Sequence, residues 1–121
     1  TVDKFEVPLE VSSTVQTTDA TPAVIAAMTT PTDTAAGMDI TISGVKDDGS
    51  EVATYKIFTT GKNVGGTVTI LDNSELSSYE DDAAWDYSVF AVAGNVLIQV
   101  QGAAAETIEW RAVVRSNIAR F

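Results

Sequence analysis

Strict alternation of apolar and polar residues near the C-terminal end constrains this chain more than any other feature. In NVLIQVQG, residues 95–102, and in TIEWRAVVR, residues 107–115, every second side chain is apolar. Because successive side chains of a strand point to opposite faces of a sheet, this period of two predicts strands with one buried face. Gly94 and Asn95 tolerate the positive φ of a tight turn, so we expect a hairpin with the preceding run, residues 86–94. These three strands are predicted to form a C-terminal antiparallel meander.

The rest of the chain also consists of short apolar or alternating runs separated by Asp-Gly and Gly-Gly turns. Further strands are expected at residues 23–30, 38–44, 52–60 and 67–72. The segment NSELSSYEDDAAW, residues 73–85, does not alternate, and we expect a loop with one helical turn capped by Asn73 or Ser74. About eight short strands with regular turn signals predict an all-β fold, an antiparallel β-sandwich of the jelly-roll-like kind.

The chain has 121 residues, the size of one domain. We expect residues 15–121 to form a single sandwich domain and residues 1–14 to form an extended N-terminal arm or an edge strand. Proline lacks the N–H that a central strand needs, which excludes a central position for this segment. Two alternatives remain open: packing at the edge of its own domain, or docking on a partner subunit. The predicted contact residues are Phe5, Val7, Pro8 and Leu9.

Composition excludes several classes of function. The net charge of −10 disfavours nucleic acids and anionic membranes as partners, and no apolar run is long enough for a membrane span. The chain contains no histidine and no cysteine, which removes the commonest general base, the commonest metal ligand and thiolate nucleophiles. The sequence therefore predicts no cofactor and no enzymatic activity.

An acidic segment is the one concentration of metal ligands in the sequence. Asp81, Asp82 and Asp86 follow one another closely, and Ca²⁺ takes carboxylate oxygens from loops of this kind. The spacing does not match an EF-hand loop, and consecutive carboxylates in a turn are more often a solvated surface. These residues stay a weak calcium candidate beside a prediction of no metal.

Aromatic and basic residues supply the candidate contacts. Trp110 lies in the apolar register of its strand and is expected in the core. Tyr79 and Trp85, beside the acidic segment, are candidates for stacking on a sugar ring, although packing in the core is the favoured alternative for Trp85. Arg111, Arg115 and Arg120 lie near the end of the sequence in a region that has no acidic residue after Glu109, and they are candidates for contact with a neighbouring subunit. Pairing within the chain is the alternative.

Four sequence segments carry a resemblance to a known family. TTDATP at 17–22, ATYKIFTTGKNVGGTVTIL at 53–71, SYEDDAAWDYSVFAVAGNVLIQVQGAA at 78–104 and IEWRAVVR at 108–115 resemble a β-domain common in virion proteins of tailed bacteriophages. The resemblance lies in the order and spacing of these segments. It implies a component of the virion surface and carries no catalytic residues.

Two functions follow from the resemblance. The first is a non-enzymatic capsid decoration protein that binds the major capsid protein and stabilises the assembled shell, and the short length of the chain favours this role. Arg111, Arg115 and Arg120 are then candidates for contact with the capsid. The alternative is a fibre or tail-appendage module that contributes to attachment to a host-surface glycan. Proteins of this kind imply a homotrimer, which would also cover exposed sheet edges.

Overall fold

The computed structural model describes residues 9–121, which form eight β-strands and no helix. Accordingly, no described helix is long and apolar enough to cross a membrane. The strands, in chain order, are β1 (Leu9–Thr17), β2 (Ala23–Thr29), β3 (Thr34–Lys46), β4 (Val52–Val64), β5 (Thr67–Glu80), β6 (Asp86–Val92), β7 (Asn95–Gln101) and β8 (Ile108–Arg120). This content confirms the predicted all-β class.

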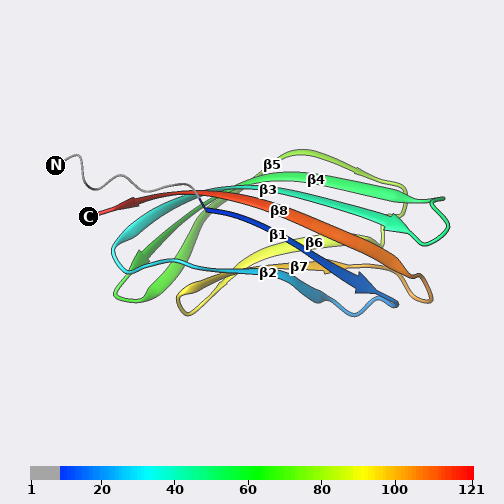
Figure 1. The fold of residues 1–121 in the computed structure, drawn as a ribbon, viewed down its shortest axis with the longest axis horizontal. Coiled ribbons are helices and arrows are strands. Elements are labelled where there is room, and N and C mark those ends of the chain that lie inside the picture. The colour runs from blue at the N-terminus through cyan, green and yellow to red at the C-terminus, as the bar shows by residue number, and fades with distance from the viewer. Residues whose placement is uncertain (1–8) are drawn as a thin grey trace.

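Two antiparallel sheets form the sandwich (Figure 1). The larger sheet has five strands in the order β1-β8-β3-β4-β5, and the smaller has three in the order β2-β7-β6. Every pairing in both sheets is antiparallel. The predicted antiparallel β-sandwich is therefore confirmed, and β3 occupies the centre of its larger sheet.

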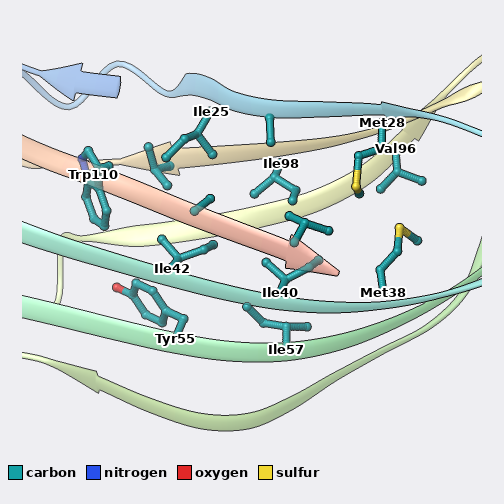
Figure 2. Close-up of a cluster of buried hydrophobic side chains, with 14 of the residues drawn as sticks. Ile25, Met28, Met38, Ile40, Ile42, Tyr55, Ile57, Val96, Ile98 and Trp110 are labelled. Atoms are coloured by element: carbon teal, nitrogen blue, oxygen red, sulfur yellow. The ribbon is translucent and has the colours of Figure 1, made fainter. Parts of the chain in front are cut away.

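The core lies between the two sheets, where the apolar side chains of facing strands interdigitate (Figure 2). Ile40 and Ile42 of β3 face Ile98 of β7, and all three are fully buried. Each such side chain contributes about 1.5–3 kcal/mol through burial of apolar surface. The apolar registers read from the sequence for residues 38–42, 53–57, 96–100 and 108–114 all fall on this buried face.

Trp110 of β8 is the most constrained side chain of this core. Its ring is fully buried and lies edge-to-face with that of Trp85, with centroids 5.5 Å apart. The indole Nε1 donates a hydrogen bond to Thr17 Oγ1 at 2.9 Å. The ring also covers Gly44 so closely that an added Cβ would stand 2.7 Å from Cε3. The prediction that Trp110 is a core residue is confirmed.

The expected C-terminal meander is only half correct. β6 and β7 form the predicted hairpin, and Ala93 in the turn between them has a positive φ of 51°. β8 does not continue this sheet, because it crosses to the larger sheet and pairs with β1 and β3. Alternation specifies which side of a strand is buried but not the sheet to which the strand belongs.

The helical turn expected after Asn73 is wrong. β5 continues through this segment to Glu80, and Asn73 supports strand structure instead. Its Oδ1 accepts from Thr59 Oγ1 at 2.6 Å, and its Nδ2 donates to the Val89 carbonyl at 3.2 Å. β5 is an edge strand with two register shifts against β4, so most of its side chains are exposed and no regular alternation is visible in its sequence.

The N-terminal part of the described chain is the edge strand β1, which pairs along its length with β8. Leu9 begins this strand opposite Ser116, and the strand runs on to Thr17, past the expected boundary at residue 14. Phe5, Val7 and Pro8, the other residues predicted for the N-terminal contact, lie outside the described residues.

Candidate functional site

Three shallow hollows lie in line on the outward face of the larger sheet, and each is lined by residues of β3. The first, of about 460 Å³, includes Gly37 and Asp39; the second, of about 310 Å³, includes Asp39 and Thr41. The third, of about 450 Å³, includes Ser43 and Val45. We call this line the trough, formed by the outward residues of β3 from 35 to 45 and their neighbours on β4 and β8. At about 3.3 Å per residue it is roughly 33 Å long.

The trough follows from the sizes of the side chains on three adjacent strands. Small outward residues such as Gly37 and Ser43 occupy the middle strand β3, and longer ones such as Phe58 on β4 and Arg115 on β8 stand beside part of it. Cross-strand pairing arranges the strands in rows of three, such as Phe58–Asp39–Arg115 and Lys56–Thr41–Val113, with the β3 residue always in the middle. The floor is therefore lower than its neighbouring strand wherever one of the long side chains stands.

Phe58 is the principal aromatic group of the trough. It points away from the core and remains 42% exposed. Its ring lies over Gly37, its diagonal neighbour across the β3–β4 pair, and a Cβ at Gly37 would stand 2.9 Å from Phe58 Cζ. Glycine thus leaves the space in which an exposed ring rests on the sheet.

Charged groups of both signs stand between the hollows. Lys56 Nζ lies 3.9 Å from Asp39 Oδ2, and Arg115 Nε donates to Glu10 Oε2 at 2.9 Å. The side chains of Arg115 and Glu10 are 71% and 54% exposed, so this pair contributes little to stability. Asp39 Oδ1 is buried and has no hydrogen-bond partner among residues 9–121.

The three arginines predicted as contact residues are placed differently. Arg111 and Arg115 lie on the outward face of β8 and line the trough. Within the described chain, Arg111 makes no ion pair or side-chain hydrogen bond. Arg120 ends β8 opposite Thr34 and is not among the trough residues. Pairing within the chain, the alternative for this group, holds for Arg115.

The acidic segment makes hydrogen bonds within its own turn and to the start of β4. Asp81 accepts hydrogen bonds from the Val52 N–H at 2.9 Å and from the Tyr79 hydroxyl at 2.6 Å, and these bonds lower the pKa of Asp81. Asp82 Oδ1 accepts from the Ala84 N–H at 2.8 Å, and Asp86 Oδ1 accepts from the Tyr87 N–H at 2.8 Å. These hydrogen bonds connect the three carboxylates to neighbouring groups of the chain.

Of the three calcium candidates, the fold brings Asp82 alone into a wider carboxylate group. Asp82 meets Glu51 and Glu106 with ligand oxygens within 4.8 Å of one another, at the junction of three turns. Partial burial, followed by the Glu106 carboxylate, raises the pKa of Glu51, whereas Lys46 at 3.7 Å opposes the shift. Glu106 Oε2 is buried without a partner in the described part of the chain. Such a group offers oxygen ligands for a hard cation.

The two aromatic candidates beside the acidic turn have different positions. Trp85 is fully buried against Trp110, so it presents no ring face to a sugar. Packing in the core sets the position of Trp85. Alternation alone does not predict that position, because Trp85 precedes the first residue of β6. Tyr79 is 57% exposed on β5, and its hydroxyl donates to Asp81. Only Tyr79 of this pair remains available for contact.

Sequence reasoning missed the trough. Alternation in residues 52–60 places Phe58 on the face opposite Tyr55 and Ile57, as the structure has it, but nothing in the sequence marks Phe58 as part of a site. The signal was present in the polar face of residues 35–45, which carries Ala, Gly, Asp, Thr and Ser in succession. A run of small side chains becomes informative only once its neighbouring strands are known.

Comparison with known proteins gives a limited result. No protein-family model and no curated protein sequence matches the chain. Three of the solved structures that match it are phage tailspike proteins. The tailspike gp49 of Acinetobacter baumannii bacteriophage Fri1, a capsular polysaccharide depolymerase, has a TM-score of 0.49 and 13% identity over 93% of this chain and 19% of its own.

The other two matches are similar in extent. The tailspike of Acinetobacter baumannii phage AM24 has a TM-score of 0.44 and 9% identity, over 88% of this chain and 26% of its own. The tailspike of Acinetobacter phage vB_ApiP_P1 has a TM-score of 0.45 and 14% identity, over 94% and 22%. This chain thus spans about a quarter or less of the tailspikes it matches.

One expectation is corrected by these comparisons. The sequence predicted a protein without enzymatic activity, but one of the matched structures is a capsular polysaccharide depolymerase. The absence of histidine and cysteine is therefore no ground for excluding catalysis, because carboxylates alone can hydrolyse glycosidic bonds. We do not maintain that prediction.

Proposed function

We propose that this chain is a component of the bacteriophage particle surface, a tail-appendage module that contributes to attachment to the host surface. The observation that carries the proposal is the trough, which presents an exposed aromatic ring and fixed polar groups on a rigid sheet. Exposed rings flanked by hydrogen-bonding side chains are suited to binding surface glycans. The order of the four sequence segments that resemble phage virion domains supports the same assignment.

The three tailspike structures agree with this proposal in their biological context. The likeness is too low for any residue or activity to be transferred from them. The proposal therefore rests on the trough of this chain and on its own sequence.

Capsid decoration is the second candidate. Its support is the long exposed edge of β5, where Leu71 and Leu76 are more than half exposed and a neighbouring protein would gain apolar contact. The partner would then be the major capsid protein. In either role we propose a homotrimer, as the resemblance to phage virion domains implies, to be tested by light scattering of the purified chain.

Purified particles distinguish the two candidates. Antibody-gold labelling and the copy number per particle, measured against the major capsid protein, report the location of the chain. Labelling of the tail and a low copy number are expected, together with slower adsorption of phage to host cells pretreated with the purified chain. Labelling spread over the capsid at hundreds of copies would favour decoration, and absence from the particle would refute both candidates.

A further inference from the structure

The trough suits a single extended chain. Its three hollows follow one strand, β3, and long side chains such as Phe58 on β4 and Arg111 and Arg115 on β8 stand beside that strand. A linear polymer lying along β3 would contact the small side chains of this strand and the longer ones beside it.

An extended peptide is a poor occupant of this trough. Peptides that add to a sheet do so through backbone hydrogen bonds at a free edge. β3 is paired on both sides along most of its length, with β4 and with β8. The trough therefore offers side-chain groups only, which is the mode in which saccharides are bound.

The charge of the trough differs from that of the rest of the chain. Lys56, Arg111 and Arg115 line it with two carboxylates, Asp39 and Glu109, and Glu10 pairs with Arg115, so three positive groups stand against three negative ones. The chain as a whole carries −10. The nearly neutral trough therefore repels an anionic polymer less than the average surface of this chain does.

The arginines of the trough have N–H donors that are available to a ligand. The Arg111 guanidinium makes no hydrogen bond or ion pair within residues 9–121, and Arg115 donates to Glu10 through Nε. A guanidinium has five N–H donors in a planar fork that matches a carboxylate. Arg111 and Arg115 are four residues apart on one strand, so their Cα atoms are separated by about 13 Å along the trough.

We propose that the trough binds one extended polysaccharide chain that carries carboxylate groups. Phe58 stacks on the apolar face of a sugar ring, and Arg111 and Arg115 bind carboxylates of units further along the polymer. This inference rests on the proposed attachment function and specifies its ligand class. It names a binding role and no chemical step.

Binding of purified polymers tests the inference without the virion. The probes are hyaluronan, alginate and polygalacturonate, with dextran as an uncharged control, and affinity is measured by calorimetry at low and at physiological salt. We expect binding to at least one of the three uronate polymers, weakened by salt, and none to dextran. Phe58→Ala should reduce the affinity about tenfold, whereas Phe58→Tyr should retain it.

Matched variants distinguish binding in the trough from effects of net charge and of exposed rings elsewhere on the protein. Arg111→Gln and Lys46→Gln change the net charge equally, but only Arg111 lines the trough, so only its loss should weaken binding. Tyr79→Ala removes an exposed ring outside the trough and should leave binding unchanged. Thermal unfolding of each variant verifies that it is folded.

Several results would overturn the inference. They are absence of binding to all three uronate polymers, equal binding of dextran, and unchanged affinity in Phe58→Ala. A change in oligomeric state on Phe58→Ala, measured by sedimentation, would identify the trough as an interface between copies. Because the virion location is measured on particles, each of these results leaves the attachment proposal to its own test.

Discussion

Gly44→Ala tests whether the core around Trp110 is as rigid as the structure indicates. An added Cβ would stand 2.7 Å from both Cε3 and Cζ3 of Trp110, closer than van der Waals contact allows. The ring has no free direction in which to move, because it is fully buried, packs on Trp85 and is bonded through Nε1 to Thr17. The clash must therefore be relieved by displacement of the strands.

The expected change in the free energy of unfolding of Gly44→Ala is the difference between a cost of overpacking and a gain in backbone entropy. Overpacking of a tight core costs about 1–3 kcal/mol, and replacing glycine by alanine within a strand returns about 0.5–1 kcal/mol. We expect the free energy of unfolding to fall by roughly 1–2 kcal/mol. For a domain of this size that corresponds to a decrease in Tm of about 4–10 °C.

Two glycines of the same sheet provide matched controls. At Gly37 the nearest atom to an added Cβ is Phe58 Cζ at 2.9 Å, the far end of an exposed side chain that can swing outward. At Gly61 the nearest atom is a backbone oxygen at 3.5 Å, an ordinary contact. Both alanine variants should unfold within a few °C of the wild type. The reasoning is refuted if Gly44→Ala is as stable as the wild type, or if Gly37→Ala loses as much stability as Gly44→Ala.

Three further predictions concern buried and titrating polar groups. Thr17→Val removes the acceptor of the Trp110 indole and should cost about 1–3 kcal/mol in denaturant unfolding, whereas Thr17→Ser should restore most of it; equal losses would contradict this. Asn63→Ala leaves the Gly66 N–H and the Thr30 carbonyl without their buried partner and should cost about 2–3 kcal/mol, and a neutral result would contradict it. Because the folded pKa of Glu51 is raised above 4.5, its ionisation lowers stability as pH rises through that window. Glu51→Gln should therefore raise Tm at pH 7, with the gain disappearing below pH 4.5, and a gain that persists at low pH would refute the assignment.

The sequence was sufficient for the strands of the core and insufficient for their partners. Residues 38–42 and 96–100 alternate because one side of each strand is buried, and that side was identified correctly. The crossing of β8 to the other sheet depends on contacts such as Gly102 with Ile108, where a Cβ would stand only 2.7 Å away. Such a contact is invisible until the fold is known.

The candidate site was less predictable than the fold. Trp85 and the acidic turn were prominent in the sequence, but the Trp85 ring is buried. The carboxylates of Asp81 and Asp86 accept hydrogen bonds from the backbone N–H groups of Val52 and Tyr87. Phe58 was inconspicuous, because its significance arises from Gly37 and Arg115 on neighbouring strands. A site built across three strands has no local sequence signature.

The pairing of β1 with β8 determines how the sandwich responds to mechanical load. Leu9 lies opposite Ser116 and Thr17 opposite Ile108, so the start of β1 and the end of β8 lie at the same end of the sheet (Figure 1). A force that pulls the start of β1 away from the end of β8 would break the hydrogen bonds between the two strands one after another. A force along β3, as from a polymer held in the trough, must instead shear the ladders on both of its sides together. We therefore expect the protein to resist tension transmitted along β3 far better than peeling from its terminal strands.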